Sequence, residues 1–284
     1  MKSIGFIDLY ISEWHANKYP ELIENANLQL GTDFAVKYVW AEKDISPVDS
    51  ISTSEWCEKY GATQCDTLEE LCEKSDILLL LAPSNPEVHL RYAEVALKYG
   101  KRIYIDKTFA PDYLTAKEIF AIAENNKTPF FSTSALRFAA ELDEIDDVKN
   151  IMITGGGSNF EEYLIHQIEM AVKILKSPAR KVMVTKVGTQ RICHFITENE
   201  TEGVIIYSPV LNFSVLAEKN NGEIVKKNIK SDFFAELLLN IVKFYENGDI
   251  PFDTNETLEV MRLRTAILAA NTKKEQWFTV KELL

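Results

Sequence analysis

Residues 76–107 read DILLLLAPSNPEVHLRYAEVALKYGKRIYIDK, and this stretch decides the fold. The nearly unbroken apolar run at 77–82 is typical of a strand in a parallel sheet that is covered on both faces. A helical pattern follows at 86–99, and Gly100 is its expected C-terminal stop. A second apolar strand is expected at 102–105. A strand, a helix and a strand in this order indicate a βαβ unit.

The same alternation extends over the whole first half of the chain. Thr67 and Glu70 form a capping-box signature for one of its helices. The other expected strands lie at 4–7, 34–40 and 129–132, and the helices at 14–25, 54–60, 67–74 and 113–125. We therefore predict that residues 1–133 form an α/β domain with a Rossmann-like, doubly wound parallel sheet.

The pattern changes after about residue 135. A helix is expected at 161–176 and two more at 232–246 and 255–270. Strand-like runs lie between them at 181–187, 190–197, 203–207 and 212–218. Successive strands joined by short polar turns indicate a mainly antiparallel sheet. We predict an α+β domain over residues 134–284 that serves substrate binding and oligomerisation.

Composition excludes several classes of protein. The chain has 284 residues, a formal net charge of −12, 46% hydrophobic and 26% charged residues, which suits a globular protein of two domains. The negative charge argues against nucleic-acid binding. The longest apolar run, at 77–83, is too short to span a membrane, and Asp8 interrupts any signal peptide. Four cysteines without metal-site spacing predict no metal and a reducing, cytoplasmic location.

Candidate site residues follow the strands, because ligands of doubly wound sheets lie outside the carboxyl ends of the strands. Lys107 is a cation next to Asp106 at such an end, and a binding role and a solvated lysine are equally compatible with its position. His89 lies on the helix after another strand and is either a ligand contact or a packed histidine. In the second half, Glu162 and His166 are four residues apart and share one helix face. A carboxylate beside an imidazole suits a general base, although a solvated ion pair gives the same spacing.

Taken together, these motifs resemble the Gfo/Idh/MocA oxidoreductases. The resemblance rests on the turn with Pro83 and Asn85 before His89, the Gly100-Lys101 pair, and Asp106-Lys107-Thr108 in place of Glu-Lys-Pro. Glu162 and His166 resemble the helical Asp-x-x-x-His of that family, and Glu169 a further acid. The resemblance covers nearly all of 1–133 and the helix at 161–176.

The resemblance implies an NAD(P)-dependent oxidation of a sugar, cyclitol or polyol. In that mechanism His166 accepts the hydroxyl proton, Lys107 binds the oxygen, and Glu162 orients the site. The nicotinamide accepts the hydride. Cofactor contacts are implied for the strand-end residues Pro83, Asn85, His89 and Asp106. Packing of the second-domain sheet implies a dimer or tetramer.

The opening loop departs from the family pattern. In SIGFIDLYISEWHA, residues 3–16, Asp8, Tyr10 and Ser12 or Glu13 replace the glycines that let a backbone approach a pyrophosphate. If a dinucleotide binds, these residues face it, and Glu42 after the second strand favours NAD over NADP. Two interpretations stay open: an oxidoreductase with an altered loop, or a cofactor-free relative that binds sugars, regulates, or catalyses another reaction.

Overall fold

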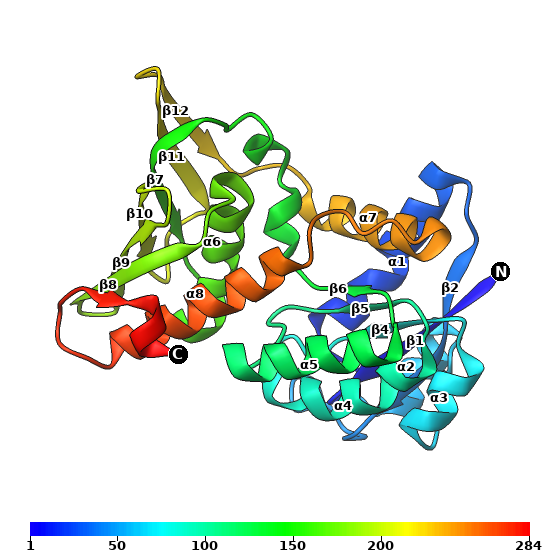
Figure 1. The fold of residues 1–284 in the computed structure, drawn as a ribbon. Helices are drawn as coiled ribbons and strands as arrows, with labels where there is room; N and C mark the ends of the chain where they lie inside the picture. The colour runs from blue at the N-terminus through cyan, green and yellow to red at the C-terminus, as the bar shows by residue number, and fades with distance from the viewer. The chain divides into compact units, whose positions relative to one another are not determined.

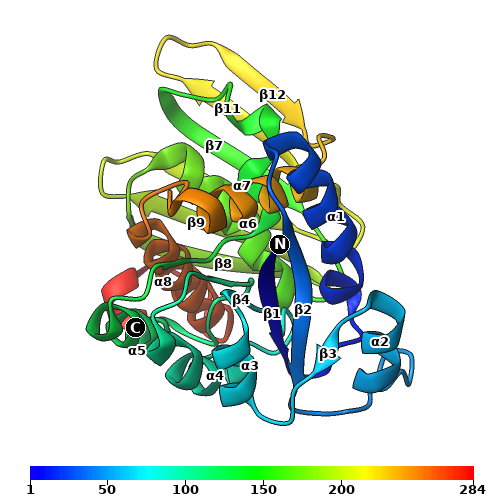
Figure 2. The ribbon, with the colours of Figure 1, turned by 90° about the vertical axis from the view of Figure 1, so that its right-hand side faces the viewer.

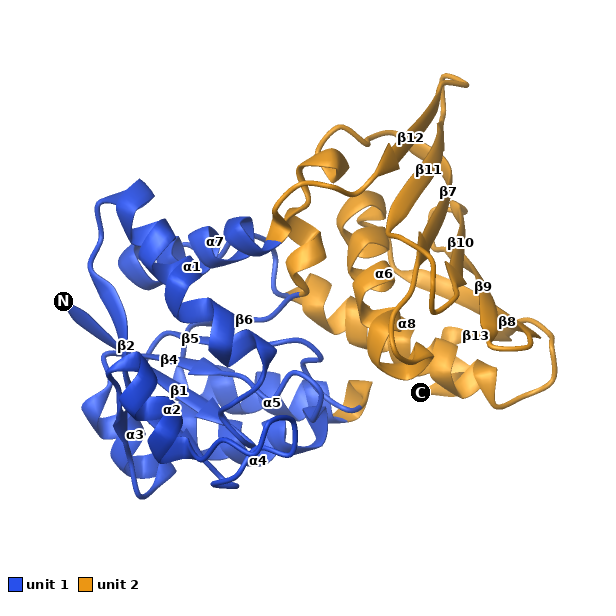
Figure 3. Cartoon of the chain, turned by 180° about the vertical axis from the view of Figure 1, so that it is seen from behind, with its two compact units in different colours: residues 1–111, 115–133, 234–254 blue, residues 112–114, 134–233, 255–284 orange.

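The computed structural model describes residues 1–284, and the chain forms two compact units (Figure 3). The first unit contains residues 1–111, 115–133 and 234–254, and the second contains residues 112–114, 134–233 and 255–284. The expected boundary at residue 133 separates the two sheets. The segment 234–254 lies far beyond that boundary in sequence and belongs to the first unit.

The sheet of the first unit is parallel throughout, in the order β3-β2-β1-β4-β5-β6. Its central strand β1 has neighbours on both sides, so that Ile4 lies opposite Val36 of β2 and Ile77 of β4 (Figure 2). The strands are β1 (Lys2–Asp8), β2 (Phe34–Ala41), β3 (Thr63–Gln64), β4 (Ile77–Leu80), β5 (Ile103–Ile105) and β6 (Phe130–Phe131). This order confirms the predicted doubly wound α/β fold.

Helices cover both faces of this sheet. In Figure 1, α1 and α7 lie on one face and α3, α4 and α5 on the other. The bounds are α1 (Trp14–Leu30), α2 (Thr53–Tyr60), α3 (Leu68–Lys74), α4 (His89–Ala96), α5 (Tyr113–Asn126) and α7 (Phe233–Asn247), with short 3-10 turns η1 (Pro86–Val88) and η2 (Leu97–Tyr99). Only half of the expected capping box forms: the Thr67 hydroxyl accepts from the Glu70 amide at the start of α3, whereas the Glu70 side chain accepts from the Asp66 amide and not from that of Thr67. Gly100 follows η2 in the left-handed conformation, as expected.

Helix α7 is tied to the first unit by aromatic and hydrogen-bonded contacts. The Tyr245 hydroxyl donates to the Leu78 carbonyl oxygen in β4 at 2.6 Å, and the Phe244 ring meets the Phe131 ring edge-on. Arg102 donates to the Tyr245 carbonyl oxygen at 2.6 Å. These contacts explain why a helix so late in the sequence belongs to the first unit.

The second unit contains a seven-stranded sheet in the order β12-β11-β7-β10-β9-β8-β13. All its pairs are antiparallel except β7 with β10, so the predicted mainly antiparallel sheet is confirmed. The strands are β7 (Val148–Gly155), β8 (Ala179–Val187), β9 (Gln190–Thr197), β10 (Glu202–Tyr207), β11 (Ser214–Lys219), β12 (Ile224–Asn228) and β13 (Phe278–Thr279).

One face of this second sheet is covered by α6 (Phe160–Leu175) and α8 (Asn255–Asn271) (Figure 1). Short 3-10 turns complete the unit: η3 (Ala135–Phe138), η4 (Ala140–Leu142) and η5 (Val280–Leu283). On α6 the apolar residues Leu164, Ile165 and Ile168 are buried. The alternating burial of β7 puts Ile151 and Ile153 on the covered face and leaves Met152 exposed.

None of the helices combines the length and the apolar character that crossing a membrane requires.

Candidate active site

The loop between β1 and α1 is built around a buried carboxyl group. Asp8 is the last residue of β1 and is 1% exposed. Its Oδ1 atom accepts hydrogen bonds from the Leu9 amide at 2.7 Å and from the Ala82 amide, beyond β4, at 3.1 Å. Its Oδ2 atom is buried and has no hydrogen-bond partner. Burial raises the pKa of Asp8 well above its ordinary value, and the nearby Glu13 raises it further.

Glu13 caps helix α1. Its side chain accepts hydrogen bonds from the Ala16 amide at 2.5 Å and the His15 amide at 2.8 Å, and the residue is 8% exposed. These amides are otherwise unpaired at a helix N-terminus. Ser12, which precedes Glu13 and has a side chain of a type that often caps helices, does not cap α1. The Ser12 hydroxyl instead donates to Asp49 at 2.7 Å.

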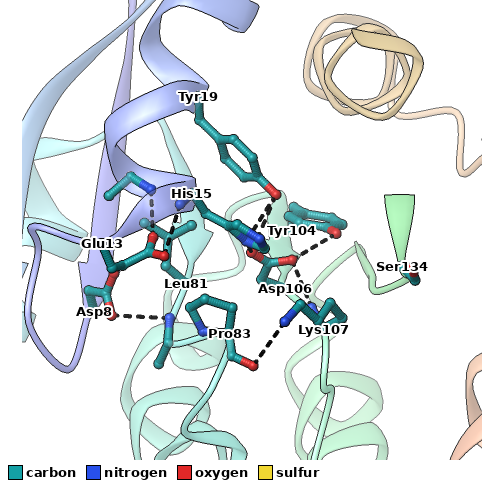
Figure 4. Close-up of polar contacts among 12 residues, drawn as sticks. Asp8, Glu13, His15, Tyr19, Leu81, Pro83, Tyr104, Asp106, Lys107 and Ser134 are labelled. Atoms are coloured by element: carbon teal, nitrogen blue, oxygen red, sulfur yellow. Dashed lines mark hydrogen bonds and ion pairs between the residues drawn. The ribbon is translucent and has the colours of Figure 1, made fainter. Parts of the chain in front are cut away.

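This arrangement bears directly on whether a dinucleotide fits. In dinucleotide-binding folds, a pyrophosphate lies against the N-terminal amides of the first helix. Here the Glu13 carboxylate occupies those amides, and Asp8 lies next to it (Figure 4). A pyrophosphate oxygen about 4 Å from the Glu13 carboxylate would be repelled by about 4 kcal/mol at the effective dielectric near a protein surface. In this conformation the loop therefore does not fit a pyrophosphate.

Asp106 follows β5 and organises a buried polar cluster (Figure 4). It forms an ion pair with His15 Nδ1, and its Oδ1 accepts from the Lys107 amide at 2.8 Å. The hydroxyl groups of Tyr19 and Tyr104 lie 3.4 and 3.3 Å from its carboxylate oxygens. Burial opposes ionisation of Asp106, but His15 and Lys107 hold its pKa below the ordinary value. Asp106 therefore anchors the turn that carries Lys107.

Lys107 lies at the carboxyl end of the sheet. The residue is 8% exposed, and its Nζ atom is 3.5 Å from the Pro83 carbonyl oxygen beyond β4. The bond from Lys107 to Thr108 is a cis peptide. A buried ammonium group beside the ends of two adjacent strands lies where this class of fold binds ligands. Because Lys107 is buried, the alternative interpretation from the sequence, a solvated lysine, is wrong.

His89 and Asn85 shape the loop after β4. His89 is 0% exposed, and its two ring nitrogens lie 2.7 Å from the Leu81 carbonyl oxygen and 3.0 Å from that of Phe109. Burial lowers the pKa of His89, so the neutral ring is favoured. Asn85 donates to Glu87 at 3.0 Å. His89 thus links two strand-end loops as a packed histidine.

Glu42 lies after β2, where the sequence predicts a contact to ribose hydroxyl groups. Its carboxylate forms an ion pair with Arg91 and accepts from the Tyr92 hydroxyl at 2.7 Å, both from α4. The backbone amide of Glu42 donates to the Asp8 carbonyl oxygen at 3.1 Å. The carboxylate is therefore held near the end of β1 by two side chains of one helix. Tyr10, in the same loop region, is half-buried.

In the second unit, His166 on α6 is held by a residue that sequence reasoning missed. Its Nδ1 atom lies 2.7 Å from the Ser134 hydroxyl, which also accepts from the Leu136 amide. The Tyr163 and Phe213 rings contact the imidazole edge-on. Glu162 lies near the start of the helix, and its carboxylate accepts from the Asn159 side chain at 3.1 Å.

A buried ion-pair cluster supports Ser134. Glu169 on α6 pairs with Arg137, and Arg137 donates to Glu256 of α8 at 2.6 Å. The second oxygen of Glu169 lies 3.3 Å from the Ser134 amide nitrogen. Arg137 and Glu169 are both almost fully buried, so each needs the other as a partner for its charge. This requirement holds the two side chains together. Glu169 therefore positions the backbone of the residue that contacts His166.

Comparison with known proteins identifies the fold. No family model matches the chain. An uncharacterized oxidoreductase of Escherichia coli, YhhX, is 34% identical over 58 residues, and the match spans 20% of this chain and 17% of that protein. A probable dehydrogenase from Thermotoga maritima superimposes with a TM-score of 0.81 and 13% identity, covering 99% of this chain and 100% of the other.

A second solved structure carries ligands. It is scyllo-inositol dehydrogenase from Lactobacillus casei with bound NAD(H) and scyllo-inositol, with a TM-score of 0.77, 12% identity and coverage of 99% of each chain. The chain thus shares the fold of these dehydrogenases, which is the two-domain fold that the sequence resemblance implies.

Proposed function

We propose that the protein is an oxidoreductase that interconverts a hydroxyl and a carbonyl group on a sugar, cyclitol or polyol, with a nicotinamide dinucleotide as co-reactant. The observation that carries this proposal is the buried Lys107 ammonium group beside the ends of β4 and β5. A cation at that position can bind a substrate oxygen and stabilise negative charge that develops on it. The similarity in fold to dehydrogenases, one with NAD(H) and scyllo-inositol bound, supports the same reaction class.

The proposed roles follow the family resemblance. In the oxidation direction the substrate loses a hydroxyl proton and a hydride from the same carbon, and a carbonyl group forms. His166 accepts the proton, and Ser134 orients the ring through Nδ1. Lys107 binds the oxygen, and Glu162 adds negative charge near the start of α6. When bound, the oxidised nicotinamide supplies the acceptor for the hydride.

NAD is the proposed form of the co-reactant. Glu42 provides carboxylate oxygens that suit ribose hydroxyl groups, and a 2′-phosphate would meet its negative charge. Arg91 partly neutralises that charge, so the preference for NAD over NADP is expected to be moderate. Glu13 occupies the helix amides at which the pyrophosphate of this co-reactant would bind.

A substrate screen tests the reaction class. Sugars, sugar acids, cyclitols and polyols would each be incubated with NAD⁺ or NADP⁺, and the appearance of reduced nicotinamide followed by absorbance. Turnover of at least one polyhydroxylated compound is expected. If none reacts and neither cofactor at millimolar concentration shifts the melting temperature, the cofactor-free sugar-binding, regulatory or non-redox alternative replaces this proposal.

Variants of the two proposed catalytic residues test their roles. Lys107→Ala and His166→Ala are each expected to lower kcat by about a hundredfold or more, because each removes a group that acts on the reacting oxygen or its proton. Lys98→Ala and His194→Ala serve as matched controls, since Lys98 is exposed and His194 is a half-buried residue of β9 whose ring contacts Trp277 edge-on. Folded variants that keep the full rate would refute the assignment.

We also propose that the protein self-associates as a dimer or tetramer through the uncovered face of the second-unit sheet. Met152 on β7 and Leu216 on β11 are direct neighbours in register, and each is 38% exposed. Exposed apolar side chains on adjacent strands suit an interface between copies.

A further inference from the structure

We propose that the N-terminus of α1 is a phosphate-binding position closed by the protein's own Glu13, so that a dinucleotide pyrophosphate binds there only after the Glu13 side chain moves away. Helix α1 has 17 residues, and Glu13 holds the amides of His15 and Ala16 at its first turn. A phosphate would use the same donors and bring the same sign of charge. The ligand class rests on the proposed function, whereas the closure rests on the geometry alone.

The buried carboxyl of Asp8 points independently to a ligand at this position. Its Oδ2 atom is buried and accepts no hydrogen bond, although Oδ1 of the same group accepts two. A buried polar atom in this state is costly unless a donor reaches it. A ribose hydroxyl group would supply such a donor, whereas protonation of Asp8 would remove the charge but supply none. Asp8 and Glu13 lie next to each other in Figure 4, so a ligand that takes the place of the Glu13 side chain would lie beside the Asp8 carboxyl group.

The backbone of the loop is held in place, so the side chain of Glu13 is the part that can move. The Ser46 hydroxyl donates to the Ser12 carbonyl oxygen at 2.6 Å, and the Lys43 amide donates to the Leu9 carbonyl oxygen at 2.8 Å. Ser12 is fixed further by its hydrogen bond to Asp49. Rotation of one side chain would free the two amides, whereas a change of the backbone would break several of these bonds. The geometry thus describes a side-chain gate.

The experiment compares Glu13 variants of the full-length protein. Glu13→Ser removes the carboxylate and leaves a hydroxyl that can cap the helix. Glu13→Gln keeps the shape and removes the charge. Glu24→Gln is the matched control, because Glu24 is exposed on the same helix. Dissociation constants for NADH, ADP-ribose and inorganic pyrophosphate would be measured by calorimetry, with circular dichroism to verify folding.

We expect Glu13→Ser to bind NADH and ADP-ribose at least tenfold more tightly than the wild type, Glu13→Gln to lie between them, and Glu24→Gln to match the wild type. If the wild type binds NADH and neither Glu13 variant binds it more tightly, the gate is refuted and the proposed oxidoreductase stands. Should Glu13→Ser bind ADP-ribose and pyrophosphate while no protein turns over a substrate, the gate stands and the proposed function fails. Absence of binding by every folded protein refutes both. If Glu13→Ser does not fold, Glu13→Gln decides by the same comparison.

Discussion

Asp8 places a carboxyl group in the interior of the first unit, where it is 1% exposed and two backbone amides donate to one of its oxygens. Its pKa is raised in the folded state, so the neutral form is favoured there relative to the unfolded chain. Such a group contributes its full stability below the unfolded pKa of about 3.9, and this contribution is lost as the pH rises through the folded pKa. At neutral pH the unfolded chain ionises residue 8 more readily than the folded chain does, so Asp8 lowers the free energy of unfolding.

Replacement of Asp8 by Asn should consequently stabilise the protein. The amide oxygen can still accept from Leu9 and Ala82, and the side chain stays neutral at every pH. We expect Asp8→Asn to raise the free energy of unfolding by about 1–3 kcal/mol at about pH 7.5 and by much less near pH ~4. Urea unfolding at several pH values measures this, with the exposed Asp66→Asn as control. A variant less stable than the wild type at neutral pH would show that the charge of Asp8 is favourable.

The site residues differ in how far sequence could find them. Lys107 follows an apolar strand, and that local pattern is enough to place it at the carboxyl end of the parallel sheet. Serine is a more common helix cap than glutamate. The Ser12 hydroxyl nevertheless donates a hydrogen bond to Asp49, and the Glu13 side chain caps the helix instead. The pairs His15 with Asp106 and Ser134 with His166 join residues 91 and 32 positions apart. No periodicity or spacing marks such pairs, because the fold alone brings them together.

Among the elements, strand β1 and helix α3 pack closely enough to require a glycine. A Cβ atom on Gly5 would lie 2.3 Å from Ser75 Oγ and 2.7 Å from Leu71 Cδ2. The single glycine of the opening segment, Gly5, therefore lets α3 pack against β1. Its role is structural.

This close contact predicts a coupled pair of substitutions. Gly5→Ala should lower the free energy of unfolding by about 1–3 kcal/mol, since the new methyl group overlaps Ser75 and Leu71. In a Ser75→Gly background the same change should cost less, because the nearest atom is gone. Chemical denaturation of the four proteins in this double-mutant cycle gives the coupling. An equal cost in both backgrounds would mean that Ser75 is not the obstacle.

Elements with strong periodicity are the ones that sequence predicts well. The apolar run of β4 and the amphipathic pattern of α6 are both found within one or two residues. Strand β7 is missing from the prediction because the polar residues Lys149 and Asn150 follow its first residue, Val148, and interrupt the apolar pattern. Strand β12 is short, largely exposed and contains two lysines, so its sequence is typical of a turn or loop and not of a strand.

At the scale of the whole molecule, sequence order and spatial grouping differ for one helix. Helix α7 follows six strands of the second sheet, yet its aromatic residues pack into the first unit. Local patterns predict the helix itself, but they carry no information about which sheet it covers. Contacts with Leu78, Arg102 and Phe131 decide that, and all three lie more than a hundred residues earlier.

The first unit should therefore be incomplete without α7. A fragment of residues 1–133 exposes the surface that Phe244 and Tyr245 bury, and it leaves the Leu78 carbonyl oxygen without the Tyr245 hydroxyl. Burial of two aromatic side chains contributes about 3–6 kcal/mol, a large part of the stability of a small domain. We expect the fragment to show weak near-ultraviolet dichroism and fast hydrogen exchange, and a peptide of residues 231–254 added in trans to restore both. The same peptide with Phe244 and Tyr245 replaced by alanine should have no effect. A fragment that is fully protected from exchange by itself would show that α7 adds no essential part of the core.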